Sequence, residues 1–408
     1  MSELAARGEA PARWRALIRI GLAELLAMSL WFSASAVSPA LQAEWSLSGS
    51  TVAWLTLAVQ LGFVVGTLMS AFLNLADVVP TRALIAACAW LAAAANAGLA
   101  LEARGAVSAI FLRFCTGFFL AGVYPPGMKL MASWFRRGRG LALGAMIGAL
   151  TLGKATPYLV NAVGRAQWRA NVLAVSGLAV VGGLIMLVFV ADGPFAAPSA
   201  RFDVAQIAKV FRNRGVRLAD FGYFGHMWEL YAMWTWVPVF LRASFTARGA
   251  PPALAEAASF LVIGSGALGC VLAGLASDRF GRTAVTSAAM TISGACCLGI
   301  GFLFHASPWV LLVFAGIWGA AVIADSAQFS ACVTELSDPQ YMGTALTLQT
   351  SIGFLLTMVS IPLIPVLVSA VGWRWAFAAL FPGPALGTLA MLRLRRLPEA
   401  AKIAQGRR

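Results

Sequence analysis

The fold is decided by a stretch in the second half of the chain, residues 255–282, which reads AEAASFLVIGSGALGCVLAGLASDRFGR. Its first part, residues 255–276, is almost wholly apolar or small, and about 20 such residues are needed to cross about 30 Å of hydrocarbon as a helix. The run ends in a short turn that carries Asp278, Arg279 and Arg282. This pattern predicts a membrane-spanning helix that ends in a charged loop at the membrane surface.

Runs of the same kind recur along the whole chain, and we count twelve of them. They cover residues 16–38, 51–73, 83–101, 106–130, 140–163, 169–191, 217–241, 255–276, 284–304, 309–333, 342–369 and 372–392. The runs are continuous rather than alternating and are too long for barrel strands. We therefore expect an all-α integral membrane protein with twelve transmembrane helices.

The composition supports a membrane protein and excludes soluble classes. The chain has 408 residues, of which 60% are hydrophobic and 11% are charged, whereas soluble domains are about 45–50% apolar and about 25% charged. The net charge of +14 could suggest nucleic-acid binding, but most basic residues flank the apolar runs and so are expected to set topology. All six cysteines lie inside apolar runs, so we expect no disulfide framework, no metal site and no cofactor.

The distribution of Lys and Arg predicts the orientation. If the N-terminus is cytoplasmic, most of the 30 basic residues fall on the cytoplasmic side, which is the side that attracts an excess of Lys and Arg. We therefore expect a multi-pass protein of the cytoplasmic (inner) membrane with both termini in the cytoplasm.

The chain also repeats itself at a nearly constant offset. Asp77 corresponds to Asp278, Gly140 to Gly343, and the pair Trp168-Arg169 to Trp373-Arg374. Such repetition predicts two related six-helix halves. The expected division is an N-terminal bundle at 1–191, a cytoplasmic linker at 192–216, a C-terminal bundle at 217–392 and a basic tail at 393–408.

The loop after the eighth run carries a resemblance to a known family. Residues 274–282, GLASDRFGR, resemble the G-x-x-x-D-R-x-G-R cytoplasmic loop of the major facilitator superfamily, while the first-half copy keeps Asp77 and Arg82 and loses both glycines. The resemblance implies two pseudo-symmetric six-helix bundles whose cytoplasmic loops latch the halves together. The candidate gating residues are Asp77, Arg82, Gly274, Asp278, Arg279, Gly281 and Arg282.

Ionisable groups inside the runs form the second candidate set. A charge at bilayer depth costs at least about 2.5–3.5 kcal/mol, so such residues persist mainly where they are paired or wet. We expect substrate binding or proton coupling at Glu24, Arg113, Lys154, His226, Glu229 and Asp325, with Gln328 one turn after Asp325 as a further cavity candidate. In the family that the chain resembles, the first, fourth, seventh and tenth spans line the central cavity. Static ion pairs between helices are the alternative interpretation.

These residues favour a secondary transporter that works by alternating access. Arg113 in an R-x-x-x-G segment is similar to proton-coupled members of the family, and Arg113 with Lys154 favours a small organic or inorganic anion as the substrate. The alternatives are proton-driven efflux of amphipathic or cationic compounds and, from another class, a membrane-embedded enzyme. No catalytic motif is present, so an enzyme is not expected. The expected partners are a small molecule, protons and the lipid bilayer, with no nucleic acid, and we expect a monomer.

Overall fold

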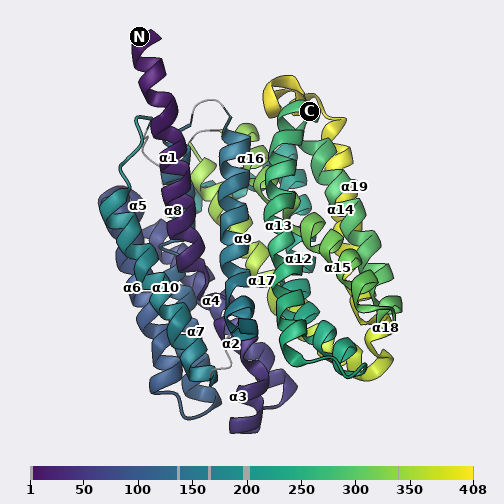
Figure 1. Cartoon of the computed structure of the whole chain (residues 1–408). Coiled ribbons are helices and arrows are strands. Elements are labelled where there is room, and N and C mark those ends of the chain that lie inside the picture. Colours follow the sequence, from purple (N-terminus) through teal and green to yellow (C-terminus); the bar gives the residue numbers. More distant parts are fainter. Residues whose placement is uncertain (1–2, 136–137, 164–166, 196–202, 339, 408) are drawn as a thin grey trace.

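The computed structural model describes the whole chain except residues 1–2, 136–137, 164–166, 196–202, 339 and 408; the side chains of residues 3–11, 77, 139 and 204 also lie outside its description. The described residues form helices and no strand. Both ends of the chain lie on the same face of the molecule, at the top of Figure 1.

Helices of the first 191 residues gather on one side of the molecule (Figure 1). They are α1 (Glu3–Met28), α2 (Ser33–Ala36), α3 (Ser38–Trp45), α4 (Gly49–Phe72), α5 (Leu75–Val78), α6 (Thr81–Leu101), α7 (Ala106–Leu120), α8 (Tyr124–Ala132), α9 (Arg139–Val163) and α10 (Trp168–Phe189).

The remaining helices form the other side. They are the 3-10 helix η1 (Val204–Gln206), α11 (Ile207–Arg212), α12 (Arg214–Thr246), α13 (Pro252–Phe280), α14 (Arg282–Gly299), η2 (Ile300–Leu303), α15 (Pro308–Ala324), α16 (Ser326–Leu336), α17 (Met342–Val371), α18 (Trp373–Ala376), η3 (Phe377–Leu380), α19 (Pro382–Arg395) and η4 (Pro398–Gly406).

All twelve predicted runs lie on helices, and ten helical segments of the described chain are long and apolar enough to cross a membrane. The other two runs lie on α1 and α12. Arg13, Arg15, Arg19 and Glu24 make α1 polar, and α12 carries His226, Glu229 and many Tyr and Trp side chains. The first helix of each side is therefore the one that departs most from an ordinary lipid-facing span.

Spans one, four and ten are among those that are broken rather than continuous. The first breaks between Met28 and Ser33, the fourth between Leu120 and Tyr124, and the tenth at Asp325. Pro125 and Pro126 lie in the first turn of α8, where the missing N–H group of proline costs little. Non-helical backbone at membrane depth is tolerated only where it is buried in protein or lines a cavity, so the breaks indicate interior positions.

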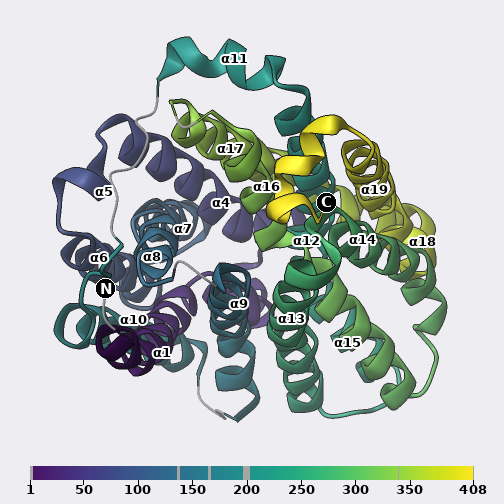
Figure 2. The same cartoon turned by 90° about the horizontal axis from the view of Figure 1, so that it is seen from above.

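The two sides meet along two helix pairs, α9 with α13 and α4 with α17 (Figure 2). Glycines bring α9 and α13 close together, since a Cβ atom at Gly144 would lie 2.6 Å from the Cys270 carbonyl oxygen and one at Gly274 would lie 2.7 Å from the Gly140 carbonyl oxygen. Small residues at such positions let helix backbones approach in a membrane. The α9–α13 part of the interface between the halves is therefore a close backbone contact.

Within the N-terminal side, α4 and α7 pack in the same way. A Cβ atom at Gly62 would collide with the backbone carbonyl oxygen of Phe114, and one at Gly117 would collide with that of Val59. Backbone atoms cannot move aside as a flexible side chain can, so these positions require glycine.

We expect Gly62→Ala to lower the melting temperature of the detergent-purified protein, because overpacking costs about 1–3 kcal/mol. Gly177→Ala on α10 is the matched control, since a Cβ atom there meets nothing within 4 Å. The control should leave the melting temperature unchanged or raise it, because alanine favours a helix over glycine. Equal effects of the two substitutions would contradict the close approach of α4 and α7.

Candidate functional site

A small cavity lies between the two sides of the molecule, with Lys154 of α9 on its wall. Its volume is about 30 Å³, enough for roughly two water molecules at about 10–15 Å³ each. The lining residues are Tyr124, Ile147, Leu150, Thr151, Lys154, Tyr223, Met227, Leu230, Tyr231, Trp234, Ile323, Ser326 and Phe354. Apart from the tyrosines, Lys154 is the only ionisable residue among these lining residues, so the wall is largely aromatic and aliphatic and carries one cation.

The ammonium group of Lys154 is held by rings. It donates a hydrogen bond of 2.7 Å to the Tyr231 hydroxyl and lies 4.5 Å from the ring centroid of Trp31, 4.9 Å from that of Tyr231 and 5.0 Å from that of Trp234. Each cation–π contact contributes about 0.5–2 kcal/mol. Among the described residues no carboxylate oxygen lies within 4.0 Å of Lys154. This buried cation is stabilised by aromatic faces without a negative partner.

Arg113 explains why Trp31 lies over Lys154. The guanidinium group is fully buried and donates hydrogen bonds of 3.0 Å to the Leu30 carbonyl and 2.9 Å to Asn96 Oδ1, with a further short one to the Trp31 carbonyl. The break after Met28 leaves carbonyl groups without helical partners, which is costly in a bilayer. Arg113 satisfies them and is not among the residues that line the cavity.

Glu24 lies behind the cavity wall on the N-terminal side. Its carboxylate is completely buried, and neither oxygen has a hydrogen-bond partner among the described residues. A Cβ atom at Gly127 would collide with Glu24 Oε1, so glycine leaves the space that the carboxylate occupies. Gly127 lies on α8, one turn after the cavity residue Tyr124.

His226 and Asp325 lie together behind the opposite wall. The distance between His226 Nδ1 and Asp325 Oδ1 is 2.8 Å, and both side chains are buried. Asp325 occupies the break between α15 and α16. Their chain neighbours Met227 and Ser326 line the cavity, so this pair flanks the cavity as Glu24 does.

Glu229 faces away from the cavity, although it shares α12 with His226. Its Oε1 atom accepts hydrogen bonds from the Ser293 hydroxyl at 2.6 Å, the Cys297 thiol at 3.0 Å and the Trp318 indole at 2.5 Å. These donors lie on α14 and α15, which are not helices of the opposite half. The geometry is that of a buried acceptor that joins three helices of one bundle.

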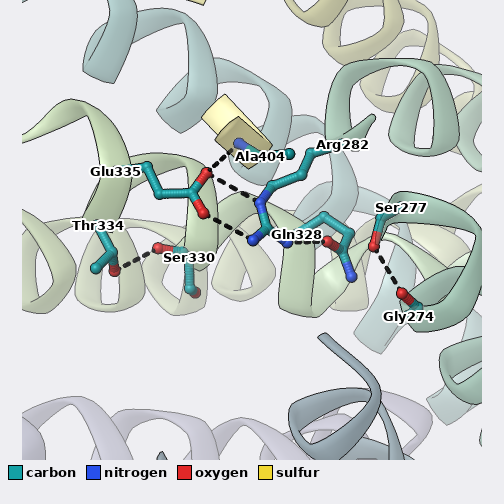
Figure 3. A network of polar contacts seen from close by, with 8 residues as sticks. All are labelled: Gly274, Ser277, Arg282, Gln328, Ser330, Thr334, Glu335 and Ala404. Carbon is teal, nitrogen blue, oxygen red and sulfur yellow. Dashed lines mark hydrogen bonds and ion pairs between the residues drawn. The ribbon is translucent and has the colours of Figure 1, made fainter. Parts of the chain in front are cut away.

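Gln328 lies in a polar network toward the end of the bundle that carries the C-terminus (Figure 3). Arg282 donates to Gln328 Oε1 at 2.7 Å and forms a two-point contact with Glu335, at 3.0 Å and 2.7 Å. The Ala404 amide of η4 donates to the same Glu335 carboxylate at 2.9 Å. The structure thus brings Gln328 to Arg282 rather than to the cavity wall, and it joins the loop arginine to the C-terminal tail.

The other predicted loop residues have distinct positions. Asp278 faces the beginning of α9, where a Cβ atom at Gly140 would lie 2.7 Å from its Oδ1 atom, and a carboxylate is favoured near a helix N-terminus. Gly281 has φ = 90°, a value that favours glycine. Arg279 is exposed beside the Phe280 ring, and Gly274 is at the α9 contact described above.

The first-half copy of this loop makes fewer contacts that can be described. Arg82 donates a hydrogen bond of 2.9 Å to the Val190 carbonyl. Asp77 lies on α5, and its side chain falls outside the described part of the chain.

Several site residues were not singled out as partners from the sequence. Trp31, Tyr231 and Trp234 surround Lys154, and Glu335 is the partner of Arg282. Residues 223–236 of the seventh predicted run are rich in Tyr and Trp, and this feature of the sequence could have indicated Tyr231 and Trp234. Asp220, buried and bonded to Gln349 Nε2 at 3.0 Å, also lay within a predicted run.

Comparisons with known proteins agree on the kind of molecule. A family model described as Major Facilitator Superfamily matches residues 20–360 and 219–408. The yeast Saccharomyces cerevisiae protein named Uncharacterized transporter ESBP6 is 24% identical over 190 residues, which are 44% of this chain and 28% of the yeast protein. This chain therefore matches only about a quarter of that relative's length.

Two solved structures share the fold. The proton:xylose symporter XylE, bound to 6-bromo-6-deoxy-D-glucose, has a TM-score of 0.72 and 15% identity, with 94% of this chain and 95% of that chain covered. A mutant of the nucleoside transporter NupG has a TM-score of 0.71 and 13% identity, with 93% of this chain and 99% of that chain covered.

We expect Trp318→Phe to destabilise the protein by about 1.5–3 kcal/mol, because it keeps a ring but removes a hydrogen bond to the buried Glu229 carboxylate. Trp309→Phe is the control, since Trp309 is 76% exposed. Melting temperatures of the two purified variants measure the effect. If Trp318→Phe melts with the control, Glu229 does not depend on this donor.

Proposed function

This chain belongs to the Major Facilitator Superfamily and is a transporter rather than an enzyme, and we propose that it moves a small organic anion together with protons by alternating access. The multi-pass helical fold is that of a secondary transporter, with the candidate site between two helical bundles, where such proteins bind their substrates near the bilayer midplane.

The observation that supports an anionic substrate is the position of Lys154. A buried ammonium without a carboxylate partner creates a positive potential in a medium of low dielectric constant, where an anion interacts with it strongly. The cavity lining contains no Asp or Glu. Efflux of organic cations, the alternative, would bring a second positive charge beside Lys154, and like charges repel each other in a buried site, so the geometry supports it less.

Glu24 and the His226–Asp325 pair supply the candidate proton carriers. Carboxylates and histidines at bilayer depth form proton relays in many transporters, and these groups lie next to lining residues on opposite sides of the cavity. When the cavity opens to the other side of the membrane, the access of these groups to water would change. XylE, a proton:xylose symporter by name, indicates that this fold is compatible with proton coupling.

The proposed gate joins the bundles at the end that carries both termini. Asp278 at the beginning of α9 would stabilise the state in which this end is closed, while the Arg282–Glu335 network would fix the loop arginine and the C-terminal tail within the C-terminal bundle. We assign the bundles to residues 1–191 and 217–392, place this end in the cytoplasm from the excess of Lys and Arg, and propose a monomer of the cytoplasmic membrane with protons as the co-substrate.

Proteoliposomes loaded with a pH-sensitive dye test this function. Acetate, benzoate, sulfate, choline and tetraethylammonium are added outside, and protein-dependent acidification of the lumen is measured against protein-free liposomes. Acidification with an anion and saturable counterflow of that anion support the proposal. Counterflow of choline or tetraethylammonium alone would contradict it.

We expect Glu24→Gln to abolish accumulation driven by a pH gradient while counterflow exchange continues, because an amide fills the same space but cannot carry a proton. Glu102→Gln is the control, since Glu102 is exposed after α6. Uptake ratios with and without the gradient measure the effect. Unchanged gradient-driven accumulation in Glu24→Gln would remove this residue from the coupling mechanism.

A further inference from the structure

The polar capacity of the cavity is limited to one charge. Lys154 is the single Lys or Arg among the lining residues, and the Arg113 guanidinium is committed to backbone and side-chain acceptors outside the cavity. The hydroxyl groups on the wall, such as those of Tyr124 and Ser326, can share hydrogen bonds but cannot neutralise a negative charge. A ligand with two negative charges would keep one of them unpaired in a buried site, which is costly.

Lys154 retains donors for that one charge. An ammonium group has three N–H donors, and its hydrogen bond to the Tyr231 hydroxyl uses one. The three surrounding rings present faces rather than acceptor atoms. Two donors of a side chain that is only 7% exposed therefore remain for an anionic ligand.

The rest of the wall favours an apolar body. Five aromatic side chains line the cavity, from Tyr124, Tyr223, Tyr231, Trp234 and Phe354. The Tyr231 ring lies 5.2 Å from that of Phe354 and 5.4 Å from that of Trp234, measured between centroids. Aliphatic groups of Leu150, Leu230 and Ile323 complete the wall. Such a surface gains free energy by burying apolar area.

The flanking acids increase the discrimination. Glu24 on one side lies against Gly127, one turn from the lining residue Tyr124, and Asp325 on the other side precedes the lining residue Ser326. In their ionised forms they would repel a second negative charge on the ligand, because like charges at short distance in a low-dielectric site destabilise each other. A monoanion can place its charge on Lys154 and keep an apolar body between these groups.

We propose that the substrate is a monocarboxylate with a flat apolar body, bound with its carboxylate on Lys154 and its body among the rings of α12 and Phe354. This inference rests on the proposed anion transport and narrows its substrate class. The cavity of about 30 Å³ is smaller than any such ligand, so binding requires the rings around Lys154 to move apart as the bundles open.

Calorimetric titration of the purified protein in detergent tests the ligand class with a matched series. Benzoate and benzenesulfonate carry one charge on an aromatic ring, phthalate carries two, benzamide carries none, benzylammonium reverses the sign, and acetate lacks the ring. We expect benzoate and benzenesulfonate to bind, acetate and phthalate to bind at least tenfold more weakly, and benzamide and benzylammonium to show no saturable binding.

Lys154→Met tests the anchor. It should weaken benzoate binding at least tenfold, while Lys129→Met, at a lysine that donates to the Ala76 carbonyl outside the cavity, should stay within twofold of the wild type. The ligand series on the wild-type protein still decides the question if Lys154→Met does not fold, which size-exclusion chromatography would reveal.

The outcomes separate this inference from the proposed function. If phthalate binds more tightly than benzoate, or if acetate equals benzoate, the monocarboxylate with an apolar body is wrong and anion transport stands. Saturable binding of benzylammonium without binding of any anion would overturn both. Unchanged benzoate affinity in a folded Lys154→Met variant would overturn the assignment of Lys154 as the anchor.

Discussion

The break in the first span is the constraint on which the site depends. A membrane helix that stops at Met28 exposes carbonyl groups that lipid cannot satisfy, and Arg113 donates to them from the fourth span. Because the chain turns there, Trp31 lies over the Lys154 ammonium instead of continuing along the helix. Arg113 therefore helps to hold Trp31 over Lys154, although Arg113 itself does not line the cavity.

The ionisable residues of the interior fall into three groups with different surroundings. Lys154 lines the cavity, Glu24 and the His226–Asp325 pair lie behind its walls, and Arg113 and Glu229 are hydrogen-bonded to neutral partners within their own bundles. These surroundings are consistent with three different roles: one residue contacts the ligand, the groups near it carry protons, and two groups hold helices together. Only the first two groups support the proposed coupling between an anion and protons.

The two bundles touch in two different ways, and this has consequences for movement. Glycines on α9 and α13 allow close backbone approach, whereas around the cavity the side chains interlock, with Lys154 against the rings of Tyr231 and Trp234. At the end with both termini, the Arg282–Glu335 network and the η4 amide lie within the C-terminal bundle, and the polar contact that crosses between the bundles is that of Asp278 with the beginning of α9. Rigid halves joined by such contacts are what alternating access requires.

The sequence by itself determined the elements of the fold, because a run of about 20 apolar residues in a bilayer has no stable alternative to a helix. It also determined which residues break the apolar pattern, and the loop at 274–282 indicated the family. Which neighbours those residues meet was decided by tertiary structure alone. His226 and Glu229 are one helical turn apart, yet one meets Asp325 beside the cavity and the other meets Trp318 away from it. Spacing along a helix places side chains on a common face only to within a broad angle, and the neighbours that fill that angle come from helices distant in the chain. For the same reason the rings around Lys154, drawn from the first and seventh spans, could be assigned only when the two bundles were brought together.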